Sequence, residues 1–210
     1  MQDIAALAGI IGALAVGTIS PGPSFVMVAR LAVATSRANG LGAALGMGAG
    51  GVVFAVAALL GLQAVLLAVP AVYLALKVLG GLYLCYLGFR IYRAAKVSLA
   101  IEAPGQSNAT SPSRSFWLGF TTQVSNPKTA IVYASVFAAF LPGTYSPSFS
   151  AVLLLVVFVI EAGWYAVVAT LLSSARPRRT YLSGKVWIDR AAGVVMGGLG
   201  FKLVASAHTA

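Results

Sequence analysis

The sequence predicts an all-α polytopic membrane protein with six transmembrane helices, arranged as two inverted three-helix repeats with broken first and fourth helices. Three observations lead to this fold class. The 210-residue chain is 60% hydrophobic and 9% charged, which is too apolar for an ordinary soluble domain. Six apolar segments are long enough to cross a bilayer. Prolines interrupt the first and the fourth of these segments.

Each apolar segment has the length of about 20 residues or more that a helix needs to cross a bilayer. The segments lie near residues 4–29, 40–67, 70–92, 115–141, 149–173 and 187–206. We expect the first to be retained as a span, because no basic stretch precedes it and it exceeds a typical signal-peptide core. In the second, Gly42, Gly46 and Gly50 are spaced by four residues, which predicts a closely packed helix face.

Two short stretches are expected to break their spans near mid-depth. The first is Ser20-Pro21-Gly22-Pro23 and the second is Ser125-Asn126-Pro127-Lys128. Proline lacks a backbone donor and clashes with the preceding turn, and irregular backbone inside a bilayer is tolerated only in protein or beside a polar cavity. We therefore expect a new half-helix after each break, capped by Ser20 or Asn126, whose free amides face a cavity and attract a carboxylate.

Basic residues alternate between the connections of the predicted spans. They occur in the first, third and fifth connections, whereas residues 62–70 and 142–150 carry no charge. By the positive-inside rule, the basic connections face the cytoplasm and both termini lie outside. The net charge of +10 is thus explained by topology, and we expect no nucleic-acid partner.

The two halves of the chain resemble each other around a polar linker. Leu87-Gly88-Phe89-Arg90 recurs as Leu199-Gly200-Phe201-Lys202, and Gly81 is matched by Gly193. The expected organisation is a first three-helix repeat over residues 1–97, a cytoplasmic linker over 98–114 and a second repeat over 115–210. Since each half has an odd number of spans, the second half crosses in the opposite sense, as in many secondary transporters.

Two ionisable residues lie deep in the predicted spans. Lys128 is about 20 Å from the inner end of the fourth span and Glu161 about 18 Å from the outer end of the fifth, at 1.5 Å per residue. They fall within about two helical turns of each other, so a buried ion pair between them is possible. Glu161 has two functional roles open to it, taking up a coupling proton or receiving a substrate ammonium group. A third interpretation is that the pair only locks helices together.

Several stretches resemble the LysE/RhtB family of bacterial amino-acid exporters. They are the run from Gly17 to Pro23, the run from Lys77 to Gly88, Asn126-Pro127-Lys128 and Glu161. The run from Val136 to Pro142 departs from the phenylalanine-proline-glutamine-phenylalanine pattern of many members. The resemblance implies a bacterial inner-membrane carrier that exports an amino acid or derivative, driven by the proton motive force. Its partners would be a small zwitterion, protons and the lipid bilayer, with a homo-oligomer left open.

We expect neither an enzyme nor a metal or cofactor site. The histidine, His208, lies at the end of the chain and Cys85 is the single cysteine, so no Ser-His, dithiol or metal constellation can form in the bilayer. The proposed substrate site contains Ser20, Pro21, Gly22, Pro23, Ser125, Asn126 and Pro127, with Glu161 and Lys128 in coupling. The alternatives are an efflux carrier for a divalent cation or another small solute, and a non-transporting membrane assembly subunit.

Overall fold

A computed structural model describes residues 2–20, 22–68, 70–97 and 111–206, and its regular secondary structure there is helical. Pro21, His208 and most of the expected linker, residues 98–110, lie outside the described residues. The helices are α1 (Gln2–Ile19), α2 (Pro23–Ala34), α3 (Arg37–Ala68), α4 (Pro70–Ala94), α5 (Pro112–Val124), α6 (Pro127–Phe140), α7 (Pro147–Leu172) and α8 (Ala175–Ala205).

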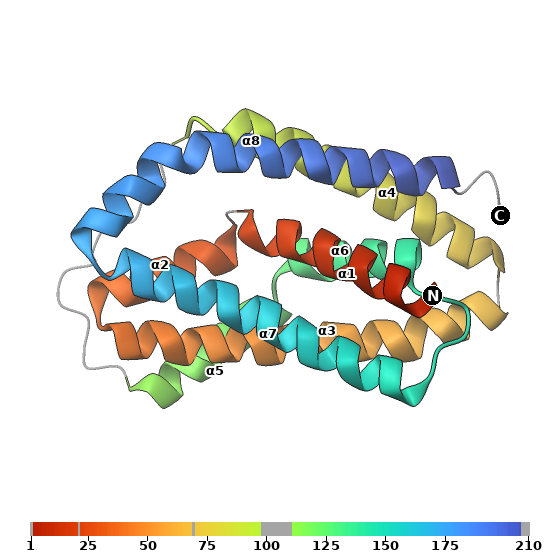
Figure 1. Cartoon of the computed structure of the whole chain (residues 1–210), viewed down its shortest axis with the longest axis horizontal. Helices are drawn as coiled ribbons and strands as arrows, with labels where there is room; N and C mark the ends of the chain where they lie inside the picture. Colours follow the sequence, from red (N-terminus) through yellow and green to blue (C-terminus); the bar gives the residue numbers. More distant parts are fainter. Residues whose placement is uncertain (1, 21, 69, 98–110, 207–210) are drawn as a thin grey trace.

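The long helices form two groups on either side of the broken ones. Helices α4 and α8 run side by side as one layer, while α3 packs against α5 and α7 in the other (Figure 1). Helices α1 and α6 lie between these groups and contact both of them. The two interrupted segments therefore lie at the centre of the molecule.

Both predicted breaks are present, but the first differs in detail. Helix α1 ends at Ile19 and α2 begins at Pro23, with a bend of 56° between them. The expectation that Ser20 caps the new helix is wrong. Gly22 occupies the N-cap position without a side-chain bond, because the second proline of the motif takes the first helical position, which its fixed φ suits. The second break follows the prediction, since the Asn126 side chain accepts a bond from the Lys128 amide and Pro127 begins α6.

Glycines allow the α4–α8 pair to approach backbone to backbone. A Cβ atom on Gly88 would lie 2.5 Å from the Gly193 carbonyl oxygen, and one on Gly81 would lie 2.8 Å from the Gly200 carbonyl oxygen. The contacts 81–200 and 88–193 show that the two helices run antiparallel. The predicted glycine face of α3 packs in the same way, since Gly42 and Gly46 lie against the backbone of α5. Such close packing is typical of membrane helices.

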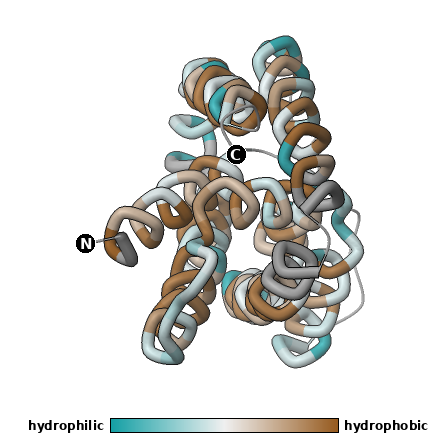
Figure 2. The backbone as a smooth tube through the Cα atoms, turned by 90° about the vertical axis from the view of Figure 1, so that its right-hand side faces the viewer, coloured by the Kyte–Doolittle hydropathy of each residue, from teal (hydrophilic) through white to brown (hydrophobic). Residues whose placement is uncertain are grey.

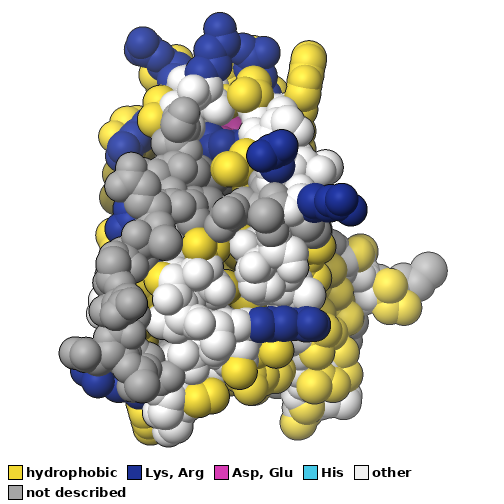
Figure 3. Space-filling model, turned by 90° about the vertical axis from the view of Figure 1, so that its left-hand side faces the viewer, with side chains coloured by type: hydrophobic (Ala, Val, Ile, Leu, Met, Phe, Trp, Pro, Cys, Tyr) yellow, Lys and Arg dark blue, Asp and Glu magenta, His cyan; other side chains and the backbone are white. Residues whose placement is uncertain are grey.

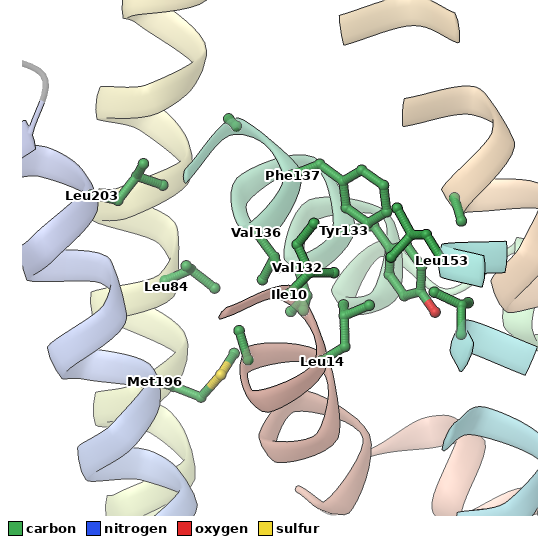
Figure 4. Packing of buried hydrophobic residues seen from close by; sticks show 14 of the residues in the cluster. Ile10, Leu14, Leu84, Val132, Tyr133, Val136, Phe137, Leu153, Met196 and Leu203 are labelled. Atoms are coloured by element: carbon green, nitrogen blue, oxygen red, sulfur yellow. The ribbon is translucent and has the colours of Figure 1, made fainter. Parts of the chain in front are cut away.

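A hydrophobic core joins the two groups of helices at one end of the molecule. Ile10 and Leu14 of α1 pack with Val136 and Phe137 of α6, and Met196 of α8 approaches them from the other layer (Figure 4). The buried side chains are apolar apart from the Tyr133 hydroxyl, and such cores are packed about as densely as organic crystals. This core extends to the α6–α7 connection, where Leu141 and Tyr145 pack against it.

The surface is apolar along the helices and basic at one end. Figure 2 shows mostly brown and pale residues along the helices. Figure 3 shows Lys and Arg side chains over the end at which α3, α5 and α8 begin. The exposed bases near this end include Arg30, Arg37, Arg93, Lys96, Arg114, Arg176 and Arg179.

Within the described ranges, two helices are each long and apolar enough to cross a membrane. They are α3 over Arg37–Gly61 and α7 over Pro147–Leu172, and the bent pair of α1 and α2 forms a third candidate. Helix α6 is a shorter apolar helix. These helices agree with a helical membrane protein, whereas the six-span layout stays a prediction.

Candidate functional site

The Glu161 carboxylate lies at the centre of the molecule and is held by side chains from three other helices. Its Oε1 accepts hydrogen bonds from the Thr18 hydroxyl at 3.1 Å and the Tyr133 hydroxyl at 3.0 Å, and its Oε2 accepts one from Gln123 Nε2 at 3.0 Å. Glu161 is 3% exposed. A buried carboxylate needs such donors, because leaving it unpaired away from water is costly.

A chain of hydrogen bonds connects this carboxylate to both helix breaks. Gln123 Oε1 accepts a bond from the Ser24 hydroxyl at 2.8 Å, and Ser24 in turn accepts one from Asn126 Nδ2 at 2.9 Å. Ser24 follows the first break and Asn126 caps the helix after the second. The polar network therefore ties the two breaks and Glu161 into one unit.

Lys128 crosses from the second break to the first. Its ammonium group donates to the carbonyl oxygens of Gly17 at 3.1 Å and Ser20 at 2.7 Å. These carbonyls lie at the end of α1, where helical partners are absent and the helix dipole is negative, which favours a cation. The ion pair that the sequence made possible between Lys128 and Glu161 is not formed. Each group is engaged by other partners, and the salt bridge found in the described ranges is Lys185–Asp189.

The Lys128 and Glu161 side chains occupy space that a larger residue at Gly22 or Gly51 would fill. A Cβ atom on Gly22 would lie 3.4 Å from the Lys128 ammonium nitrogen. A Cβ atom on Gly51 of α3 would lie 2.9 Å from both Glu161 Cγ and the Tyr133 hydroxyl oxygen. Gly51 therefore gives α3 a further glycine contact, at the site, beside the face that packs against α5.

These groups surround a small central cavity. It is lined by Leu14, Gly17, Thr18, Ser20, Gly22, Ser24, Gln123, Asn126, Lys128, Thr129, Val132, Tyr133, Glu161 and Tyr165. The volume that the centre of a water molecule can occupy is about 20 Å³, which is room for about one water molecule. The Ser20 hydroxyl is buried there without a hydrogen-bond partner among the described residues. In this conformation the space among these polar groups is too small for an amino acid.

The structure brings together most of the predicted site residues. Ser20, Gly22, Asn126, Lys128 and Glu161 all line the central cavity. Pro23 and Pro127 are exposed to a neighbouring cavity, which also borders Gly22, Asn126 and Lys128. Ser125 differs from these residues, because it is exposed at the end of α5 and lines neither cavity. Nothing is described for Pro21.

Sequence reasoning missed four of the polar partners of Glu161 and Asn126. They are Thr18, Ser24, Gln123 and Tyr133. Three of these lie within five residues of a break, so a search for polar side chains flanking the prolines in apolar segments would have found them. Tyr133 carries no such signal, because a tyrosine in a membrane helix is also common at the lipid interface.

The neighbouring cavity is much larger. The volume that the centre of a water molecule can occupy there is about 420 Å³, within the range of small-molecule sites. It lies between the two breaks and the α4–α8 layer, and it reaches Arg90, Ala94 and Val97 near the basic end of the molecule. We call it the vestibule. The part of the chain that the structure describes contains no group of three or more His, Cys, Asp or Glu residues placed to hold a metal ion.

Comparisons with known proteins agree on one family. Residues 15–207 match the family described as LysE type translocator. The threonine efflux protein of Escherichia coli K12 is 34% identical over 192 residues, which cover 91% of this chain and 93% of the relative. The leucine efflux protein of Klebsiella pneumoniae is 28% identical over 123 residues, or 58% of this chain and 56% of the relative. No solved structure matches this chain.

Proposed function

Because the chain belongs to the LysE type translocator family, we propose that it exports an amino acid or an amino-acid derivative from the bacterial cytoplasm across the inner membrane, in exchange for protons. The relatives named as threonine and leucine efflux proteins support an amino-acid cargo. The observation that carries the mechanism is an acid and a base that line one buried cavity without pairing with each other.

An α-amino acid supplies the two charges that such a cavity needs. Its ammonium group would bind the Glu161 carboxylate, and its carboxylate would bind the Lys128 ammonium group and the amides at the start of α2 or α6. Lysine has three donors, and two of them are used by the carbonyls of Gly17 and Ser20. The buried Ser20 hydroxyl offers a further partner for the substrate.

Proton exchange follows from competition at one carboxylate. A proton on Glu161 and a substrate ammonium group beside it both neutralise the same charge, so each excludes the other. A carrier that returns only with Glu161 neutralised would release the amino acid outside, take up a proton there and release it to the cytoplasm. This is antiport, and it needs a single buried acid that each side reaches in turn.

The two halves are proposed to form an inverted repeat. The sequence match relates Gly81 to Gly193 and Gly88 to Gly200. In the structure Gly81 packs on Gly200 and Gly88 packs on Gly193. Exchanging the halves therefore converts each contact into the other, as a two-fold relation between α4 and α8 requires. This relation supports alternating access by movement of one half against the other.

The proposed topology places the basic end in the cytoplasm and both termini outside. The bases near the starts of α3, α5 and α8 support it, as does the positive-inside rule. The vestibule reaches this basic end, whereas the hydrophobic core extends to the α6–α7 connection at the other end. The conformation described is therefore proposed to face the cytoplasm.

Transport by purified protein in liposomes tests this function. Each of the twenty amino acids, radiolabelled, would be offered under an imposed pH gradient, with protein-free liposomes as the control. We expect uptake of one or a few amino acids, accelerated when the compartment opposite the label is acidic and abolished by a protonophore. Uptake of none of the twenty, or stimulation by a divalent cation alone, would contradict the proposal.

A further inference from the structure

The vestibule contains a buried carboxylate that the central mechanism does not use. Asp189 of α8 lines it and is 4% exposed. Its Oδ2 accepts a bond from Lys185 at 2.6 Å, and Lys185 also donates to the Ala95 carbonyl oxygen at 3.1 Å. Asp189 is not among the predicted site residues, although an acid four residues after a lysine in a helix is a recognisable ion-pair signal.

The other carboxylate oxygen of Asp189 has no partner. Its Oδ1 is buried and accepts no hydrogen bond from any described residue. Leaving a buried charged acceptor unsatisfied is costly, and such groups are rare in folded proteins. A ligand that donates hydrogen bonds would satisfy it. The vestibule has the volume for one, whereas the central cavity does not.

Lys128 faces the same space from the opposite wall. It lines both the vestibule and the central cavity, together with Asn126 and Gly22. A ligand in the vestibule therefore meets a carboxylate on α8 and an ammonium group at the break of α6. These two charges match those of an α-amino acid. Arg90 and Lys185 also line the vestibule and would attract a simple anion, but such a ligand would leave the Asp189 Oδ1 atom without a hydrogen-bond donor.

We propose that the vestibule is a capture site for the cytoplasmic amino acid, in which Asp189 accepts the α-ammonium group and Lys128 binds the α-carboxylate. The inference rests on the proposed function and its topology. Because Lys128 borders both cavities, the substrate keeps its carboxylate partner as it moves inward, and only its ammonium group changes partner, from Asp189 to Glu161. The vestibule then selects for amino acids before the central cavity opens.

Competition by a des-amino analogue tests this site on the cytoplasmic face. Inside-out membrane vesicles expose that face, and right-side-out vesicles expose the other. The labelled probe is the amino acid that wild-type protein transports fastest in the screen of twenty. Its unlabelled form and the same compound without the α-amino group are the two competitors. The half-inhibitory concentration of the des-amino compound, divided by that of the unlabelled amino acid, measures how strongly each face requires the ammonium group. We call this quotient the selectivity ratio.

Asp189→Asn is the decisive variant. Lys185 would take the remaining carbonyl oxygen, so the amide nitrogen would face the substrate ammonium group. We expect the ratio to fall about tenfold or more on the cytoplasmic face, as for a lost hydrogen bond to a charged group, and to stay unchanged on the outer face. Asp189→Glu keeps the charge but shifts the oxygens, so an intermediate fall is expected, and it serves as the second variant should Asp189→Asn fail to fold.

Lys185→Met separates binding from structure. It removes the ion pair while keeping the Asp189 carboxylate, so it is expected to lower stability but to preserve the ratio. A ratio unchanged by Asp189→Asn, or lowered equally on both faces, would overturn the capture site. If the selectivity ratio fell equally in Asp189→Asn and in Lys185→Met, that result would also overturn the capture site. Transport of no amino acid by wild-type vesicles would instead contradict the proposed function.

Discussion

The Glu161 carboxylate and the Lys128 ammonium group line the same cavity, yet each is bonded to other partners. Glu161 accepts from Thr18, Tyr133 and Gln123, while Lys128 donates to two carbonyls at the end of α1. A direct ion pair would cancel both charges and leave nothing for a zwitterion to bind. Their separation keeps an acceptor and a donor available in one cavity.

Glu161→Gln is expected to impair transport strongly and to abolish its response to a pH gradient. Glutamine keeps the size of the side chain but cannot take up a proton, and its amide lacks the charge that binds an ammonium group. Initial uptake in proteoliposomes should fall by about tenfold or more, the effect of losing a charged hydrogen bond. Ser183→Ala, an exposed change near the start of α8, provides the control. Undiminished uptake that still responds to pH would rule out Glu161 as the coupling group.

Lys128→Met is expected to impair both stability and substrate affinity. The change leaves the carbonyls of Gly17 and Ser20 buried without their donor, and it removes the partner of the substrate carboxylate. The apparent melting temperature in detergent should fall, and the KM for the amino acid should rise. Lys128→Arg, which keeps the charge, should restore part of the stability. A variant with normal melting and normal KM would show that Lys128 serves neither role.

Loss of a helix cap can be separated from loss of function by comparing two caps. Asn126 caps α6 inside the site and also donates to Ser24, whereas Ser146 caps α7 at its Phe149 amide, outside the site. Replacing either by alanine should cost about 1 kcal/mol of stability. Only Asn126→Ala should also reduce transport. Equal transport by the two variants would mean that the Asn126 side chain acts only as a cap.

Glycine contacts between α4 and α8 give a matched test of packing. Gly88→Ala would place a Cβ atom 2.5 Å from the Gly193 carbonyl oxygen, whereas Gly198 has no neighbour within 4 Å of such an atom. Gly88→Ala should therefore lower the melting temperature. Gly198→Ala should leave it unchanged or raise it slightly, since alanine is the better helix former by up to about 1 kcal/mol. The reverse order would show that the close approach of α4 and α8 is not required.

The sequence predicted the breaks well because proline acts locally. Pro23 and Pro127 each begin a helix, and this follows from the missing donor and the fixed φ. The cap of the first break was mispredicted at Ser20 because two prolines in four residues leave two possible helix starts. Local rules cannot choose between them when tertiary packing decides.

The partners of the charged residues could not be predicted in the same way. Tyr133 reaches Glu161 from a different helix, and Lys128 reaches Gly17 across 111 positions of the chain. Such contacts depend on how helices cross and not on spacing within one segment. Their similar depth shows only that Lys128 and Glu161 could meet. Depth could not show that two carbonyl oxygens at the end of α1, those of Gly17 and Ser20, bind the lysine instead.

Membrane topology provides the last prediction. In a Cys85→Ala background, single cysteines would be placed at Thr144, in the exposed connection between α6 and α7, and at Ala38, exposed near the start of α3. A membrane-impermeant maleimide added to intact cells should label Thr144→Cys, because that connection lies outside under the positive-inside rule. Ala38→Cys should be labelled only after the cells are permeabilised. The opposite pattern would reverse the proposed topology and turn the vestibule toward the exterior, which would remove its role in capturing cytoplasmic substrate.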